Sequence, residues 1–159
     1  KELGVILDMF KDKDGDWAAT VAVYGGKEVD YKVDKKASQS VGDVIIFTLD
    51  ADDELEVDTY VYGARGVGEL PTDMDMDVVG GKVLAKTSSS ITIDLNNNGT
   101  ADSNEKFSIS SKTLYFDVTD GFDDIDTAAY RDIKTDGTTK VALVVDKGLV
   151  KVVYITDQN

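Results

Sequence analysis

The sequence predicts an all-β protein made of two small barrel-like units in tandem. Runs of residues rich in Val, Ile, Thr, Tyr and Phe recur along the whole chain, as they do in β-strands. Segments rich in Gly, Asp, Asn and Ser separate these runs and supply the conformations that turns need. The order of runs and turns in the first half recurs in the second half. Each half therefore holds enough short strands for a small closed or partly open barrel.

Two kinds of strand are predicted in the first half. Apolar and charged residues alternate at positions 27–33 and again at 54–59, which is typical of a strand with one buried face. Positions 43–49 are apolar on both faces, which is typical of a central strand. The pairs Gly25-Gly26 and Asp52-Asp53 mark turns between strands.

The second half shows the same kinds of strand and one different element. Positions 114–118 alternate, whereas positions 141–145 are apolar on both faces. Residues 123–133 predict one short helix, because their apolar residues fall on roughly one side of a helical turn. A single helical turn is also expected at positions 37–42. The helix-forming apolar residues are Ile125, Ala128, Ala129 and Ile133.

The internal repeat sets the predicted domain boundaries. We assign residues 1–62 to a first barrel-like unit, residues 63–80 to a linker that contains Pro71, and residues 81–159 to a second unit. One continuous β-sandwich is the alternative, and we favour two barrels because the order of elements repeats. The corresponding segments are Gly4–Leu7 with Gly81–Leu84, Gly42–Asp50 with Thr139–Asp146, and Glu54–Val61 with Leu149–Thr156.

Composition narrows the classes of function. The chain has 31 Asp and Glu against 17 Lys and Arg, and its net charge of −14 argues against nucleic-acid and membrane-surface partners. It contains neither cysteine nor histidine, which excludes thiol nucleophiles, thiolate metal sites, the usual zinc ligand and the commonest general base. No carboxylate pair or serine is singled out by a catalytic motif, so we predict no enzyme. The start at Lys1 suggests a fragment or a processed product.

A segment of twelve residues, Asp94 to Glu105, has the ligand spacing of an EF-hand-type calcium loop. Oxygen-bearing side chains occupy its first, third, fifth, ninth and twelfth positions, and Gly99 occupies the sixth, where the chain must turn sharply. Calcium prefers a shell of oxygen ligands of this kind. The predicted ligands are the side chains of Asp94, Asn96, Asn98, Asp102 and Glu105 and the backbone carbonyl of Thr100.

A second interpretation of this segment stays open. Its flanks, 91–93 and 106–109, have strand patterns, so the loop would lie in a β-hairpin rather than between two helices. The alternative is therefore an Asx-rich hairpin turn with Asn98-Gly99 in type I′ geometry. A further acidic turn lacks a glutamate that could close a calcium loop, and we interpret it as a solvated hairpin. Its acidic residues are Asp12, Asp14 and Asp16.

Four segments together resemble the all-β repeat regions of S-layer-type surface proteins of Gram-positive bacteria, which usually carry S-layer homology modules as anchors. The segments are 41–50, 92–102, 115–119 and 150–157. The resemblance implies an extracellular structural role at the bacterial cell surface or cell wall, with calcium helping folding or assembly. It also implies neighbouring domains of the same protein, or lattice copies, as partners.

The sequence thus predicts a non-catalytic structural or spacer module of a bacterial surface protein, stabilised by calcium in its second half. The alternative is an extracellular binding module for a glycan or a partner protein. Tyr60 and Tyr62 fall on the charged face of their strand and are expected to be the exposed aromatic pair. Trp17 shares a strand face with Val21 and Val23 and is expected in the core.

Overall fold

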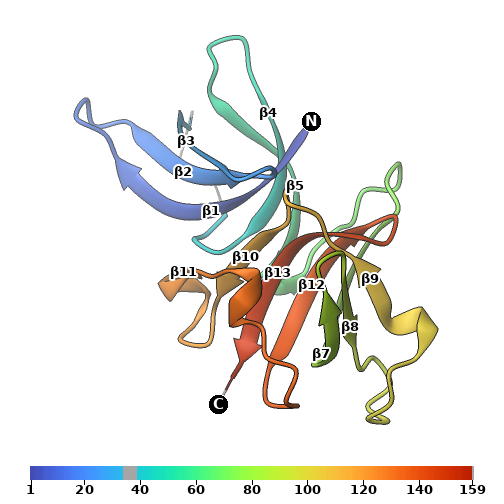
Figure 1. The fold of residues 1–159 in the computed structure, drawn as a ribbon. Helices are drawn as coiled ribbons and strands as arrows, with labels where there is room; N and C mark the ends of the chain where they lie inside the picture. The colour runs from blue at the N-terminus through green and yellow to red at the C-terminus, as the bar shows by residue number, and fades with distance from the viewer. Residues whose placement is uncertain (34–38, 159) are drawn as a thin grey trace. The chain divides into compact units, whose positions relative to one another are not determined.

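The computed structural model describes residues 1–33 and 39–158, and it divides the chain into two compact units (Figure 1). Unit 1 comprises residues 1–71 together with 121–125, and unit 2 comprises residues 72–120 together with 126–159. Strands dominate both units, which confirms the all-β prediction. Among the described residues, no helix is long and apolar enough to cross a bilayer.

The sheet of unit 1 closes on itself through its pairings. Its strands follow the order β3-β2-β1-β4-β5-β6, and every neighbouring pair is antiparallel. An isolated parallel bridge between Val33 and Leu55 then joins the end of β3 to the start of β5. The spatial order 4-1-2-3 of the first four strands is that of a Greek key. The strands are β1 (Glu2–Lys11), β2 (Trp17–Val23), β3 (Lys27–Lys32), β4 (Val44–Leu49), β5 (Leu55–Gly63) and β6 (Gly66–Val67).

Unit 2 repeats the order of the first five strands and has two strands, β10 and β11, where unit 1 has β6. Its sheet runs β11-β10-β13-β12-β7-β8-β9, and β9 pairs in parallel with β13 through Ser108 and Leu149. Strands β7, β8, β9, β12 and β13 therefore take the places of β1 to β5, and β10 adds parallel to β13. The strands are β7 (Met76–Thr87), β8 (Ser90–Ile93), β9 (Lys106–Ser108), β10 (Leu114–Asp117), β11 (Asp126–Thr127), β12 (Lys140–Asp146) and β13 (Leu149–Asp157).

The equivalence of the two units extends to single hydrogen bonds. The Ile6 N–H donates to the Asp43 carbonyl at 3.0 Å, and the Val83 N–H donates to the Thr139 carbonyl at 3.0 Å. Likewise, Val33 donates to the Trp17 carbonyl, and Ile109 donates to the Ser89 carbonyl, both at 2.9 Å. Asp43 and Thr139 therefore occupy the same place in the two units.

A glycine sits at one shared position because two strands approach closely there. A Cβ atom on Gly4 would lie 3.0 Å from the Ala22 carbonyl oxygen, and one on Gly81 would overlap the Asp94 carbonyl oxygen. Gly4 pairs with Val23 of β2, and Gly81 approaches Asp94, the residue that directly follows the equivalent strand β8. The repeated glycine in the sequence thus marks a close backbone approach in each unit.

Each unit has its own hydrophobic core, and the predicted central strands are confirmed. Residues Val44 to Phe47 of β4 are at most 2% exposed, and Val141 to Val145 of β12 are at most 7% exposed. Trp17 packs against the core of unit 1. The buried core residues include Ile6, Val21, Val33, Ile45, Phe47 and Leu55 in unit 1, and Val83, Ile93, Ile109, Val141, Leu143 and Val150 in unit 2.

The helix predicted at 123–133 does not form. The segment instead contains two single 3₁₀ turns, η2 (Phe122–Asp124) and η3 (Tyr130–Asp132), on either side of β11. The Asp132 carboxylate accepts a hydrogen bond from the Ala129 N–H at 2.8 Å, which closes one turn locally. The Tyr130 carbonyl accepts from the Lys86 ammonium at 2.9 Å and from the Ile133 N–H at 3.2 Å, so both of its lone pairs are used within the single turn.

Two other predicted segments contain regular structure or fall partly outside the described residues. The stretch 63–80, expected as a linker, contains β6 and the beginning of β7. The expected turn at 37–42 lies partly outside the described residues. Of its described residues, Ser40 accepts a hydrogen bond through its carbonyl from the N–H of Asp43, the residue after the segment, at 3.1 Å.

Candidate metal site

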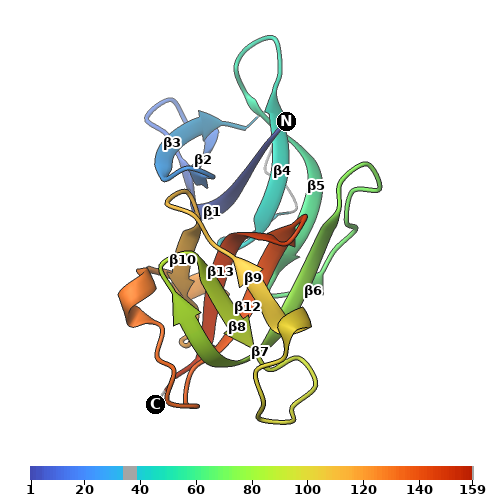
Figure 2. The same ribbon diagram turned by 45° about the vertical axis from the view of Figure 1, so that its right-hand side comes forward.

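The predicted calcium loop connects β8 to β9 in unit 2, where Figure 2 shows it projecting beyond the sheet. At the equivalent place in unit 1, the three residues 24–26 join β2 to β3. The twelve-residue segment is therefore the longer version of a hairpin that both units share. A single 3₁₀ turn, η1 (Ser103–Glu105), leads out of the loop into β9.

The first and last residues of the loop are buried acids that bind its backbone. Asp94 is 6% exposed and Glu105 is 1% exposed. The Asp94 carboxylate accepts from the N–H groups of Asn98 at 3.1 Å and Gly99 at 2.8 Å. Both Glu105 oxygens also accept backbone hydrogen bonds, from Leu95 at 2.6 Å and Asp102 at 3.0 Å, with Asn96 at 3.4 Å. The two acids thus fix the path of the chain from both ends.

Three further predicted ligands converge in the middle of the loop. The side-chain amides of Asn96 and Asn98 donate to the same Asp102 carboxylate oxygen, at 3.4 and 3.2 Å. The Asn98 side-chain oxygen accepts from the Thr100 N–H at 2.9 Å. Gly99 has a φ of 74°, a conformation that favours glycine, so the sharp turn falls at the predicted sixth position.

The loop brings Asn96, Asn98 and Asp102 together, but it does not gather the carboxylates of Asp94, Asp102 and Glu105 into one cluster. Among the described residues, Asp12, Asp14 and Asp16 are the group of three carboxylates that lie close enough to share an ion. Asp94 and Glu105 face backbone N–H groups, whereas Asn96, Asn98 and Asp102 face one another at the exposed end. A calcium ion in the loop would need Glu105 to turn an oxygen from these N–H groups towards the ion. The oxygen chemistry of the set fits a hard cation, since every side chain in it carries a carboxylate or amide oxygen.

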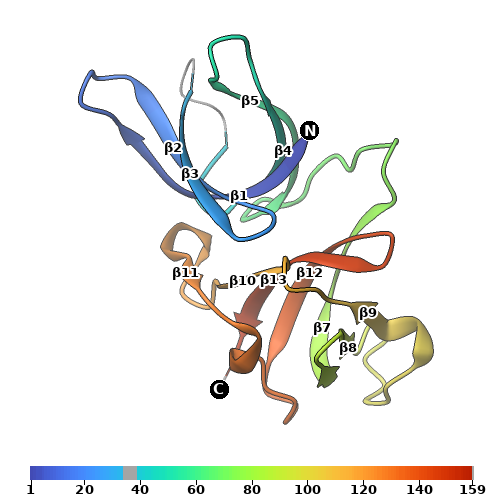
Figure 3. The same ribbon diagram turned by 45° about the horizontal axis from the view of Figure 1, so that its top comes forward.

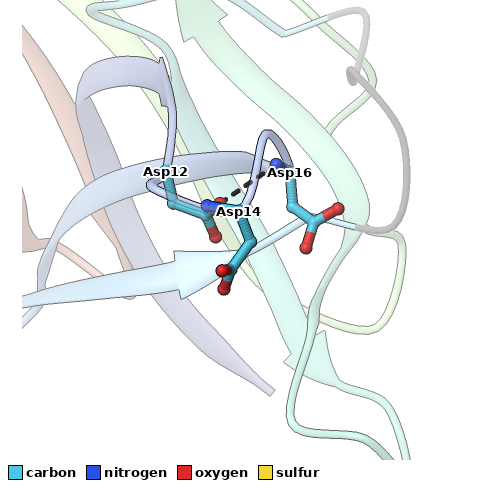
Figure 4. Close-up of side chains that lie close together, drawn as sticks. All are labelled: Asp12, Asp14 and Asp16. Carbon is cyan, nitrogen blue, oxygen red and sulfur yellow. Dashed lines mark hydrogen bonds between the residues drawn. The ribbon is translucent and has the colours of Figure 1, made fainter.

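The second acidic turn gathers its carboxylates more tightly. Oxygen atoms of Asp12, Asp14 and Asp16 lie within 4.8 Å of one another between β1 and β2 (Figure 4). The Asp12 side chain accepts from the N–H groups of Asp14 at 2.9 Å and Asp16 at 3.0 Å. The Asp14 and Asp16 side chains are exposed, and Asp16 lies 3.6 Å from the Lys32 ammonium.

A second hairpin of unit 1 has the same turn without such a cluster. Between β4 and β5, the Asp50 side chain accepts from the N–H groups of Asp52 at 2.9 Å and Glu54 at 3.0 Å. Figure 3 shows both hairpins extending as projecting ends of unit 1. The Asp12 side chain therefore takes its position by closing the turn, as Asp and Asn side chains commonly do. No ion is needed to account for it.

The aromatic pair expected on the surface is half-buried and engaged. The Tyr60 hydroxyl donates to the Gly66 carbonyl at 2.8 Å, and the Arg65 guanidinium lies 4.2 Å from the centre of its ring. Tyr62 contacts Phe122 edge to face, with ring centres 5.7 Å apart. Tyr60 thus has one ring face covered by arginine, which leaves less aromatic surface for stacking a sugar.

No sequence motif singles out Asp43, which is the most buried aspartate among the described residues. It is 1% exposed, and its carboxylate accepts from the Ser40 N–H at 2.9 Å and lies 3.6 Å from the Arg65 guanidinium. Burial raises the pKa of Asp43, and the Ser40 and Arg65 contacts offset this only in part. The only sequence signal is an acid directly before an apolar strand.

No family model, curated protein or solved structure matches this chain. The geometry offers one loop with the ligand chemistry of a calcium site, one exposed acidic turn and one buried carboxylate. The three differ in burial and in hydrogen bonding, and only the loop combines buried acids with converging polar side chains.

Proposed function

We propose that the chain is a non-catalytic structural module of an extracellular bacterial surface protein of the S-layer type, and that calcium bound by residues 94–105 stabilises unit 2. The observation that carries the calcium proposal is the loop itself. Buried acids mark its two ends, and Asn96, Asn98 and Asp102 converge between them. This set of oxygen-bearing side chains has the chemistry of a calcium loop.

The repeated architecture supports a structural role. Two units with the same strand order follow one another in a single chain, as in proteins that use repeated domains as spacers. The negative charge of the chain keeps such a module soluble and gives it affinity for cations. The resemblance to surface-layer repeats adds the extracellular setting, in which neighbouring domains or lattice copies are the partners.

Calcium would act by favouring the folded loop. In the absence of an ion, Asp94, Asp102 and Glu105 bring three negative charges into one short segment. An ion that binds only the folded loop stabilises it by a free energy that grows with the logarithm of the ion concentration relative to the dissociation constant. Extracellular calcium sites typically have dissociation constants of roughly 10⁻⁴ to 10⁻³ M. At about ten times the dissociation constant, binding would add about 1.4 kcal/mol to the free energy of unfolding.

Differential scanning calorimetry in EDTA, in calcium and in magnesium tests the proposal. Calcium at a few millimolar should raise the melting temperature of the transition that contains unit 2 by about 3 °C, while magnesium should not. The informative variant is Asp102→Asn, because this side chain is bonded to side-chain amides rather than to the backbone framework of the loop. The variant should fold and lose most of the calcium response.

A control variant in the β1–β2 turn shows whether the calcium response comes from the β8–β9 loop. Asp14→Asn removes one carboxylate from the exposed cluster of unit 1 and should leave the calcium response unchanged. Equal melting temperatures of the parent protein in EDTA and in calcium would reject the metal proposal. The segment would then be a polar hairpin loop that its own hydrogen bonds fold.

We propose no second function. A glycan-binding or protein-binding module is the alternative from the sequence, and its candidate platform was the pair Tyr60 and Tyr62. Tyr60 is covered by Arg65 on one ring face, and Tyr62 packs against Phe122. No contact among the described residues favours the binding module over the structural one.

A further inference from the structure

Asn98 is the one asparagine in this sequence that a glycine follows. In an Asn-Gly pair, the backbone nitrogen of the glycine can attack the side-chain carbonyl of the asparagine and close a succinimide ring. Glycine favours this attack because it has no Cβ atom to hinder the approach. Both residues are exposed, and a Cβ atom on Gly99 would meet no other atom within 4 Å. Water therefore has access to the pair.

The folded loop holds the nitrogen that would have to attack. The Gly99 N–H donates to one carboxylate oxygen of Asp94 at 2.8 Å, and the Asn98 N–H donates to the other oxygen at 3.1 Å. Asp94 is 6% exposed, so both bonds have a charged acceptor that is largely shielded from water. A backbone nitrogen attacks a carbonyl only after it has lost its proton. The proton held by Asp94 is therefore the one that the reaction must remove.

The side chain of Asn98 is held less firmly than the Gly99 nitrogen. Its oxygen accepts from the Thr100 N–H at 2.9 Å, and its amide donates to the Asp102 carboxylate at 3.2 Å. Both of these bonds lie at the exposed end of the loop, where water competes for the same groups. The bond from Gly99 to the buried Asp94 carboxylate is therefore the stronger restraint on the reaction.

We propose that Asn98 is a site of self-modification and that Asp94 controls its rate by holding the Gly99 N–H. When the loop opens and hydroxide removes the Gly99 amide proton, the Gly99 nitrogen forms a bond to Cγ of Asn98. The bond from Cγ to Nδ2 breaks, and Nδ2 takes a proton from water and leaves as ammonia. Water then opens the succinimide ring at either carbonyl, which leaves aspartate or isoaspartate at position 98.

The modification is permanent and adds negative charge to the loop. Once ammonia has left, the amide of Asn98 no longer donates to Asp102, and a second carboxylate takes its place. Two carboxylates this close repel each other. The isoaspartate product also adds a carbon atom to the backbone directly before Gly99. Opening of the loop therefore leads to a lasting change in the segment that forms the candidate metal site.

The rate of deamidation in the folded chain and in the urea-unfolded chain tests the proposal. EDTA is present throughout, so the outcome does not depend on the calcium proposal. Peptide mass spectrometry gives the fraction of Asn98 that has been converted with time. The folded chain should react at least about ten-fold more slowly, because bonds to a charged acceptor must open first. Amide hydrogen exchange of Gly99 measures the same opening independently.

Three variants decide the result. Asp94→Ala removes the acceptor and should raise the rate in the folded chain about ten-fold, with a matching loss of Gly99 protection. Asp94→Asn keeps the shape and an acceptor oxygen without the charge, so it should fold and give a smaller increase.

Asp12→Ala is the matched control, because Asp12 also accepts two backbone hydrogen bonds, but in unit 1. This variant should leave the rate at Asn98 unchanged. The proposal is overturned if the folded and unfolded chains react at equal rates, or if both Asp94 variants react no faster than the parent protein.

Discussion

The two acidic loops of this protein look alike in sequence and differ in what their carboxylates do. In the β1–β2 turn, Asp14 and Asp16 are exposed, and one side chain, Asp12, holds the turn. In the β8–β9 loop, the acids at both ends are buried and together accept five backbone hydrogen bonds. Carboxylates that lie close together therefore do not by themselves indicate a metal site. Burial and the use of backbone donors distinguish the two loops.

The largest expected effect is the loss of Glu105. Glu105→Ala would leave the N–H groups of Leu95, Asn96 and Asp102 without their acceptor, and we expect a loss of about 3 kcal/mol in the free energy of unfolding. Urea denaturation in EDTA measures this without any contribution from calcium. Asp14→Ala in the other loop should change the free energy by less than about 0.5 kcal/mol. If Glu105→Ala and Asp14→Ala lowered the free energy of unfolding equally, the acids of the two loops would not differ in how much they stabilise the fold.

The next-largest effect concerns β7, the strand that contacts the first residue of the β8–β9 loop. Gly81→Ala would force a Cβ atom against the carbonyl of Asp94, the first residue of the loop, and should cost about 2 kcal/mol. Gly80→Ala is the matched control, because its Cβ would lie 3.2 Å from the Val141 carbonyl and needs a smaller shift. Chemical denaturation of both variants compares them. A cost at position 80 as large as that at 81 would show that Asp94 is not the obstacle.

A smaller effect tests the two turns of unit 1 against each other. Asp12→Ala and Asp50→Ala each remove one oxygen that accepts two backbone hydrogen bonds, and each should cost about 1 kcal/mol. The near identity of the two turns predicts similar values by thermal denaturation. A much larger cost at Asp12 in calcium than in EDTA would instead indicate an ion at the β1–β2 turn.

The smallest effect is a stabilisation. Asp53 has a φ of 61°, whereas the equivalent position of the other turn is Gly15, with a φ of 81°. A non-glycine residue is strained in this region, so Asp53→Gly should raise the free energy of unfolding by up to about 1 kcal/mol. Gly15→Ala should lower it by a similar amount, as the difference in melting temperature will show. An unstable Asp53→Gly variant would mean that the Asp53 side chain makes a stabilising contact.

Much of the secondary structure could be predicted because strand signals are local. Alternation at 27–33 and the apolar run at 43–49 follow from the two faces of a pleated strand, and both segments form strands. The glycine of the calcium-loop spacing also falls where the chain adopts a positive φ. The prediction of a helix at 123–133 was wrong, also for a local reason. The Asp132 side chain closes a single turn with the Ala129 N–H, and this bond competes with the backbone bonds of a longer helix.

The sequence by itself determined the all-β class, the strands that lie in the core, and a loop rich in oxygen ligands. Only the tertiary structure decided which strands meet, since the bridge from Val33 to Leu55 and the pairing of Ser108 with Leu149 join residues far apart in the chain. It also decided that Glu105 faces backbone donors and that Asp43 is buried beside Arg65. Side-chain periodicity reports which face a residue takes. Which strand pairs with it, and which residues lie opposite each other, depends on long-range register, which no local pattern encodes.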